Sequence, residues 1–441
     1  MKSLKGKKLL VLGGSASNVQ LVRFAQQMGA FVVVADNQEN RPGKDAADDS
    51  VLISTDDYDA LCKYIKDNQI DGVATGAGEW NVVNAMKLCK KANLTYYADE
   101  RLWDICQDKR NFKDCCKKYG VPTVPEFSIA NKPIDKDYPV IVKPVDGCSS
   151  RGISICYNEE ELNKAIAFAL SLSQSSNVII EKYIDNGGVT IDAKYVVVDG
   201  QCYLEALGER YVLEGGLITA ISFYPSSLIN RFMEKVNPNV QKMFEALGYK
   251  NGVFFFQAIP DGEEIYVYEM GLRVSGGMIY NMTEAVGCNN VMKMLIYHSL
   301  TGKMCEKEDL ETIDPNFHGK QACTVAFPLR LGTIAHVEGI EEIKNFPGIV
   351  DITVYYGEGH ECVPKHLNTL DQLFARVIVI CDDEKELFKT IMKIRGLVKV
   401  TDNKNNDMIN WTTFDKLLNY SMLCGGVSRL NRCLSEPHNK R

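Results

Sequence analysis

The chain has 441 residues, which predicts two to four domains because single hydrophobic cores stop growing at about 250–300 residues. Its 45% hydrophobic and 24% charged residues exclude a disordered or fibrous protein, and a net charge of -7 offers no surface for a nucleic acid. No apolar run reaches the ~18 residues needed to cross a bilayer. Fifteen cysteines without an export signal indicate reduced thiols. We therefore expect a cytoplasmic protein with neither a nucleic-acid nor a membrane partner.

The first hundred residues alternate between short apolar runs and amphipathic segments. Apolar runs predict strands at residues 8–12, 30–35, 51–54 and 72–75, and helices fall between them at 17–28, 58–67 and 80–91. This order is typical of a parallel, doubly wound sheet. We assign residues 1–104 to a Rossmann-like domain.

The first turn of this domain, GGSASN, invites a dinucleotide interpretation. The spacing from Gly13 to Asp36 fits a glycine-rich turn followed by a ribose-binding acid. However, Ser15, Ala16 and Ser17 break the required glycine pattern. A sheet that binds no NAD is therefore favoured, and an NAD-dependent oxidoreductase stays as the weaker alternative.

The middle of the chain mixes helices and paired strands, and its last third changes character. Predicted elements after the first domain are a helix at 108–119 closed by Gly120, a hairpin at 138–155, a helix at 159–172, strands at 178–180, 189–207, 253–259 and 265–269, and helices at 236–247 and 289–301. We assign residues 105–315 to one domain with a division near 184. Alternating apolar runs then predict a small β-rich cap at 316–402, and a linker with a C-terminal helix and tail at 403–441.

The most informative segment is the hairpin YPVIVKPVDGCSSRGISI. An apolar strand delivers Lys143, which Pro144 then follows. The connecting loop offers backbone N–H groups, hydroxyls and a guanidinium from Gly147, Cys148, Ser149, Ser150, Arg151 and Gly152. Such donors can wrap a triphosphate while the lysine neutralises its charge. No helix opens with Gly-Lys-Ser/Thr, so this is not the Walker pattern.

This hairpin resembles the phosphate-gripping hairpin of the ATP-grasp superfamily, and the resemblance extends over roughly residues 7–400. It implies an ATP-grasp fold between a Rossmann-like domain and a C-terminal cap, and it implies that Lys109 and Lys143 contact the nucleotide phosphates. It further implies a hinge whose backbone reads the adenine edge and whose glutamate accepts from the amino group. The matching residues are Glu181, Lys182, Tyr183 and Ile184.

The run YEMGLRVSGG supplies the remaining resemblance. Hairpin pairing brings Gln257 and Glu269 to one side of a cleft. In the family these positions hold the metal, and the matching Arg273 steadies the γ-phosphate and the acyl phosphate. Gly271 stands where the family has a metal-binding Asn, and Gly188 stands where many members have a ribose-binding glutamate.

The resemblance implies a carboxylate–amine ligase that uses ATP and Mg²⁺, or Mn²⁺, and that forms a homodimer. Carbamoyl-phosphate synthase-like or carboxyphosphate-forming chemistry is an alternative within the family. The departures at Gly271 and Gly188 keep open a non-catalytic ATP-binding sensor or scaffold. Only six histidines are present, and none forms a recognisable Cys–His or Ser–His–Asp arrangement, so a nucleophilic enzyme has little support.

Overall fold

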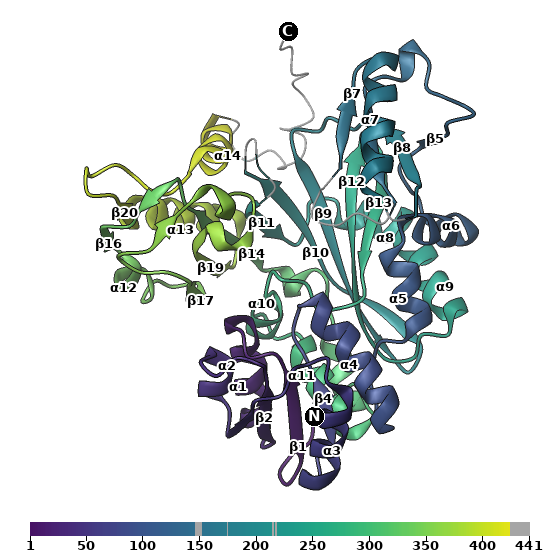
Figure 1. Ribbon diagram of the computed structural model, residues 1–441. Helices are drawn as coiled ribbons and strands as arrows, with labels where there is room; N and C mark the ends of the chain where they lie inside the picture. The colour runs from purple at the N-terminus through teal and green to yellow at the C-terminus, as the bar shows by residue number, and fades with distance from the viewer. Residues whose placement is uncertain (146–151, 174, 214–215, 217, 424–441) are drawn as a thin grey trace.

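The computed structural model describes residues 1–145, 152–173, 175–213, 216 and 218–423. Three parts surround a common centre: the N-terminal sheet, a small hairpin subdomain and a large antiparallel sheet that carries the C-terminal part (Figure 1). The predicted α/β fold class is confirmed.

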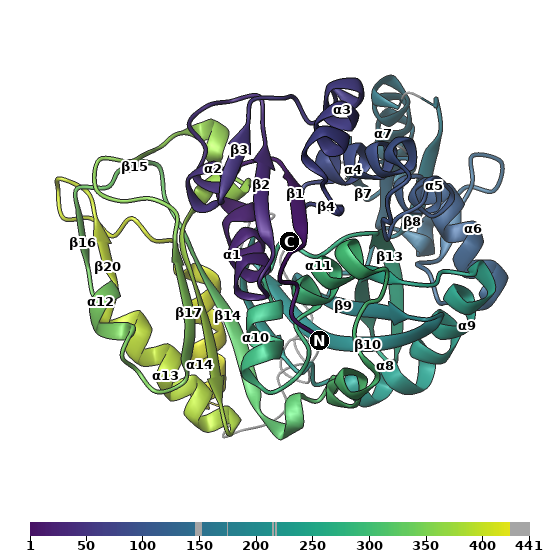
Figure 2. The ribbon, with the colours of Figure 1, turned by 90° about the horizontal axis from the view of Figure 1, so that it is seen from below.

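The N-terminal domain is built on a four-stranded parallel sheet in the order β3-β2-β1-β4. Its elements are β1 (Lys8–Leu12), α1 (Val19–Gln27), β2 (Phe31–Ala35), α2 (Pro42–Ala46), β3 (Asp49–Val51), α3 (Tyr58–Asn68), β4 (Gly72–Ala74) and α4 (Glu79–Ala92). Helices α3 and α4 cover one face. The other face packs against α1 and against α11 (Val291–Thr301), which returns from far along the chain (Figure 2).

The hairpin subdomain has a four-stranded sheet in the order β5-β8-β6-β7. Its elements are α5 (Glu100–Gln107), α6 (Lys109–Tyr119), β5 (Glu126–Phe127), β6 (Val140–Pro144), β7 (Ser154–Cys156), α7 (Glu159–Leu172) and β8 (Val178–Lys182). Asp108 caps α6 through the N–H groups of Arg110 and Asn111, and Gly120 ends it with φ +75°. Strands β6 and β7 form the predicted hairpin. The tip of that hairpin, residues 146–151, lies outside the described residues.

One eight-stranded antiparallel sheet, in the order β13-β12-β9-β10-β11-β14-β19-β17, forms the body of the molecule. Its strands are β9 (Val189–Val198), β10 (Gln201–Val212), β11 (Thr219–Tyr224), β12 (Gly252–Asp261), β13 (Glu264–Gly271), β14 (Gln321–Pro328), β17 (Ile349–Val354) and β19 (Leu373–Cys381). Strands of the predicted cap thus extend the central sheet. The domain boundaries themselves stay a prediction.

The remaining elements flank this sheet. They are α8 (Ile229–Lys235), α9 (Asn237–Leu247), α10 (Tyr280–Ala285), β15 (Gly332–Thr333), β16 (His336–Glu338), α12 (Ile340–Ile343), β18 (Glu361–Cys362), α13 (Glu384–Leu397), β20 (Lys399–Thr401) and α14 (Thr412–Leu423). Between Gly332 and Glu338 the predicted cap forms two short strands, β15 and β16, each paired with a different partner.

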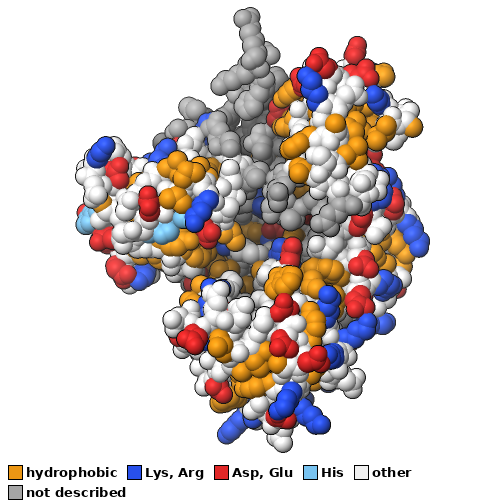
Figure 3. Space-filling view, in the orientation of Figure 1, with side chains coloured by type: hydrophobic (Ala, Val, Ile, Leu, Met, Phe, Trp, Pro, Cys, Tyr) orange, Lys and Arg blue, Asp and Glu red, His pale blue; other side chains and the backbone are white. Residues whose placement is uncertain are grey.

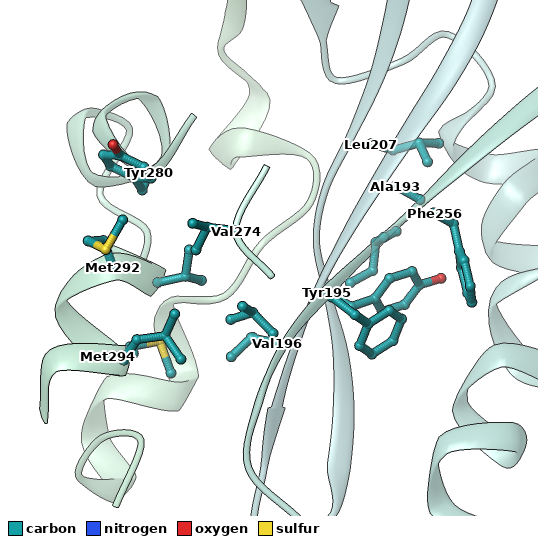
Figure 4. Packing of buried hydrophobic residues seen from close by; sticks show 14 of the residues in the cluster. Ala193, Tyr195, Val196, Leu207, Phe256, Val274, Tyr280, Met292 and Met294 are labelled. Atoms are coloured by element: carbon teal, nitrogen blue, oxygen red, sulfur yellow. The ribbon is translucent and has the colours of Figure 1, made fainter. Parts of the chain in front are cut away.

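Alternation along β9 divides the core into two layers. Tyr195 packs with Phe256 on one side of the strand, and Val196 faces Met292 and Met294 of α11 on the other (Figure 4). Helix α11 therefore contacts both the large sheet and the N-terminal sheet, and its burial couples the two.

Gly208 of β10 is required by a close aromatic contact. A Cβ at this position would lie 2.3 Å from Cε1 of Tyr224, whose ring is itself held by a hydrogen bond to Lys194. We expect Gly208→Ala to lower the free energy of unfolding by about 1–3 kcal/mol, because the ring must move in a packed interior. Urea denaturation measures this. Gly357→Ala is the control, since no atom lies within 4 Å of its Cβ position; equal midpoints for both variants would contradict the expectation.

Candidate active site

Two cavities lie where the parts of the molecule meet, and one arginine lines both. The first, of about 360 Å³, is lined by Lys109, Glu269 and Arg273 together with Glu79 of the N-terminal domain. The second, of about 270 Å³, is lined by Arg273 and by residues of the large sheet. The space-filling view shows a hollow with charged side chains at this meeting point (Figure 3). Three residues singled out from the sequence are thus brought together in the first cavity.

Strand register places a row of polar side chains on one face of the large sheet. Glu269 lies directly opposite Gln257, and Gln257 lies directly opposite Asp192. Directly opposed residues of an antiparallel pair point to the same face. The predicted pairing of Gln257 with Glu269 is therefore confirmed, and Asp192 is a third member of the row.

Lys143 contacts a carboxylate within its own subdomain. Its Nζ lies 2.6 Å from Oε2 of Glu181, while the other oxygen of Glu181 accepts a hydrogen bond from the fully buried Lys113. Lys113 also donates to the carbonyl of Val124 at 2.9 Å. Burial alone would raise the pKa of Glu181, but the two lysines outweigh it and hold that pKa below its usual value. Lys113 could not be singled out from the sequence, because it lies in a helix that carries several other lysines.

The predicted hinge begins with Glu181, whose carboxylate is engaged by the two lysines, and continues through Lys182, Tyr183 and Ile184. Lys182 pairs with Asp261 at 2.6 Å and so ties β8 to the turn between β12 and β13. The N–H of Tyr183 donates to the carbonyl of Pro139 at 3.1 Å. Within the described part of the chain the N–H of Ile184 donates to no acceptor. One backbone donor of the hinge is therefore available to a ligand.

Arg273 is held between the N-terminal domain and an aromatic ring. Its Nη2 and Nε lie 2.9 and 3.2 Å from Oε1 of Glu79, and its guanidinium lies 5.1 Å from the ring centre of Phe255. The same ring fills the space beside Gly271, where a Cβ would come within 2.3 Å of it. An Asn at this position would collide with Phe255, which explains why the chain carries glycine there.

The residues around Glu269 fit a magnesium ion held mainly by phosphates. Glu269 is exposed to the cavity and has no ion-pair partner among the described residues. The surroundings of Gln257 favour the orientation in which its amide nitrogen faces Glu269 and its oxygen accepts from Arg210 at 3.1 Å. The described chain holds no cluster of three or more His, Cys, Asp or Glu suited to a metal. Mg²⁺ needs only one or two protein carboxylates beside substrate phosphates, so Glu269 suffices.

The structure also shows the surroundings of Gly188, which stands where many members of the family have a ribose-binding glutamate. Gly188 has φ +78° and open space around its Cβ position. Asp192 is the acid nearest to Gly188 in the sequence, but its carboxylate is engaged elsewhere. Its Oδ2 lies 2.6 Å from Nζ of Lys194, and the residue lines the second cavity. No acid replaces the family's ribose-binding glutamate from this position.

The expectation that no Cys–His arrangement exists is wrong. Cys288 Sγ lies 3.5 Å from Nε2 of His318, whose Nδ1 lies 3.2 Å from Asp314. Sequence could not reveal the arrangement, because 30 residues separate the cysteine from the histidine. Burial raises the pKa of the Cys288 thiol, so the nucleophilic thiolate is disfavoured.

Polar groups in and beside the glycine turn of the N-terminal domain are hydrogen-bonded within the protein. Asp36, the acid expected to bind a ribose, accepts from the N–H of Gly14 at 2.7 Å. The amide of Asn18 binds the carbonyls of Leu12 and Gly13. These contacts support the interpretation of a sheet without NAD.

Comparisons with known proteins agree with this arrangement. Residues 126–270 match the family model described as D-ala D-ala ligase C-terminus. The formate-dependent phosphoribosylglycinamide formyltransferase of Sulfurisphaera tokodaii is 26% identical over 296 residues, covering 60% of this chain and 70% of that protein. The C-terminal section of the carbamoyl phosphate synthase large chain of Aquifex aeolicus is 30% identical over 182 residues, covering 39% of this chain but only 33% of its own length.

Solved structures share the fold over nearly the whole chain. The L-amino acid ligase of Bacillus licheniformis has a TM-score of 0.73 at 18% identity, and the match covers 91% of this chain and 100% of that one. The biotin carboxylase domain dimer of the Hydrogenobacter thermophilus 2-oxoglutarate carboxylase, solved with MgADP, ADP and bicarbonate, has a TM-score of 0.72 at 20% identity, covering 97% and 95%. In the described residues no helix is long and apolar enough to cross a membrane.

The buried Glu181 cluster yields a stability prediction. We expect Lys113→Met to lower the free energy of unfolding by about 3–5 kcal/mol at neutral pH, because it leaves a buried carboxylate with one cation instead of two. The pKa of Glu181 is depressed in the folded protein, so its contribution is complete above the unfolded pKa of about 4.3 and is lost as the pH falls through the folded pKa.

Urea denaturation at pH 7 and below pH 4 measures the effect, and the difference between wild type and variant should shrink at the lower pH. Lys164→Met is the matched control, since its ion pair with Glu160 is exposed and is expected to matter by less than about 1 kcal/mol. Equal losses in both variants would contradict the assignment.

Proposed function

We propose that this chain is a member of the ATP-grasp superfamily and an ATP-dependent ligase that joins a carboxylate to an amine. The observation that carries the proposal is the position of Arg273, which lines both the 360 Å³ and the 270 Å³ cavity. A phosphoryl group bound in the first cavity can be passed to an acid bound in the second without leaving the reach of this guanidinium.

The nucleotide would lie in the first cavity and against the hinge. Lys109 and Lys143 would contact the phosphates, whereas the predicted contacts of Gly147, Cys148, Ser149, Ser150 and Arg151 lie outside the described residues. The free N–H of Ile184, together with the backbone of Glu181, Lys182 and Tyr183, would read the adenine edge. Because Lys143 is paired with Glu181 at 2.6 Å, nucleotide binding would compete with that ion pair for its charge.

The chemistry balances without a protein nucleophile. A carboxylate oxygen attacks the γ-phosphorus, the bond to the β–γ bridging oxygen breaks, and ADP leaves with that electron pair. The amine nitrogen then attacks the acyl carbon, the C–O bond to phosphate breaks, and the nitrogen loses a proton. Arg273 would stabilise the charge on the transferring group and on the acyl phosphate. Positioning and electrostatics therefore account for the demands of the reaction.

Glu269 would hold Mg²⁺, or Mn²⁺, and Gln257 would complete the site if its amide turned its oxygen toward Glu269. The ion, when bound, neutralises charge on the phosphate oxygens. A homodimer is part of the proposal, supported by the dimeric biotin carboxylase domain.

The second cavity favours an organic acid over bicarbonate. Its volume of about 270 Å³ exceeds that of a bicarbonate ion several-fold and suits a small organic molecule, because one water in the liquid takes about 30 Å³. Carboxyphosphate or carbamoyl-phosphate chemistry is therefore the weaker candidate. A non-catalytic nucleotide sensor would need the same first cavity but no acid in the second.

Turnover with substrate pools tests the proposal. Purified protein with ATP, Mg²⁺, mixed small carboxylic acids and mixed amines is expected to release ADP and phosphate only when both an acid and an amine are present. Glu269→Gln should lower kcat at least about 100-fold while the fold is retained, because the residue is exposed and the charge that holds the metal is lost.

Glu263→Gln on the same hairpin is the control, since its side chain is 78% exposed and lines neither cavity. Nucleotide binding without release across the pools would favour the sensor. Release that bicarbonate alone supports would favour carboxyphosphate chemistry, and normal turnover of Glu269→Gln would remove the metal assignment.

A further inference from the structure

Two arginines in the second cavity have no carboxylate partner. Arg210 of β10 and Arg376 of β19 both line the cavity, and neither lies within 4.0 Å of an acid among the described residues. Arg210 donates through Nε and Nη2 to the hydroxyl of Thr219 at 3.0 and 2.8 Å. Arg376 donates through Nη1 to the carbonyl of Gly276 at 2.9 Å. Neutral acceptors therefore fix both guanidinium groups without neutralising them.

The other charges of the cavity are already compensated. Asp192 is paired with Lys194 at 2.6 Å, and Arg273 is paired with Glu79 at 2.9 Å. Among the residues that the structure describes, the lining thus has an excess of two positive charges, from Arg210 and Arg376. A half-buried cation that lacks a counter-ion favours binding of an anion.

Strand register directs both arginines toward the same space. Arg210 lies opposite Ser222, Ser222 lies opposite Thr324, and Arg376 lies opposite Ala326, two residues beyond Thr324. All of these side chains therefore lie on one face of the sheet. Three strand spacings separate β10 from β19, so the Cα atoms of Arg210 and Arg376 lie about 14–16 Å apart across the sheet. A small ligand between them can reach both long side chains.

We propose that this cavity selects an acid that carries a second anionic group, either a carboxylate or a phosphate, and that Arg210 and Arg376 bind that second group. The inference rests on the proposed ligase function, in which the reacting carboxylate lies beside Arg273. Guanidinium groups bind carboxylate and phosphate oxygens through paired hydrogen bonds, and the contacts to Thr219 and Gly276 hold both groups ready. Arg210 and Arg376 are thus specificity-determining residues.

Matched probes that differ by one charge test this. Calorimetric titration of the wild-type protein with ADP and Mg²⁺ compares L-glutamate with L-glutamine, and O-phospho-L-serine with L-serine. In at least one pair the more anionic member is expected to bind at least about tenfold more tightly, because it gains a charge-assisted contact. The pair that shows the difference identifies the second group as carboxylate or phosphate.

Arg376→Gln and Arg210→Gln should each reduce that preference to less than about threefold while leaving the binding of the neutral member unchanged. Arg330→Gln is the control, since Arg330 is exposed at the end of β14 and lines neither cavity. Equal binding within both pairs, no binding by any probe, or a preference that survives both substitutions overturns the inference. ADP release is recorded separately: anion preference without release counts against the ligase function, and release with neutral acids counts against the anion site alone.

Discussion

The register of the large antiparallel sheet is the constraint on which the site depends. Because Glu269, Gln257 and Asp192 lie opposite one another on three neighbouring strands, a slip of one residue would turn this row to the opposite face. The same register carries Arg210 and Arg376 to that face from β10 and β19. The second cavity therefore follows from strand pairing, whereas the first also takes Glu79 and Lys109 from helices outside the sheet.

A second dependence joins the hairpin subdomain to nucleotide binding. Glu181 is buried with two lysines, and it is the first residue of the predicted hinge. Lys113 is fully buried, whereas Lys143 retains access to solvent and lies 5.7 Å from the ring centre of Tyr268 on the large sheet. If phosphates draw Lys143 away, Lys113 still compensates Glu181. The paired lysines thus allow one charge to move without leaving a buried carboxylate unpaired.

Local signals in the sequence were sufficient for most elements. The helix start near Asp108, the glycine stop at Gly120 and the lysine that follows an apolar run each depend on a few neighbouring residues, and each lies where it was predicted. Helix α2 lies between β2 and β3, where no helix was predicted from the sequence. Residues whose role arises from distant pairing escaped prediction. Glu79 meets Arg273 across 194 positions, a contact that no local pattern indicates.

Two glycines on the site face, Gly271 and Gly208, follow from packing. At Gly271 the missing side chain makes room for Phe255, and at Gly208 it makes room for Tyr224. Phe255 in turn supports the guanidinium of Arg273, and Tyr224 holds Lys194 beside Asp192. The chain has therefore exchanged a possible metal ligand for an aromatic support beneath the arginine that joins the two cavities. Under the proposed ligase function, such an exchange would shift stabilisation of the transferring phosphoryl group from the metal toward Arg273, because a ring-stacked and ion-paired guanidinium is held in place before the substrate binds.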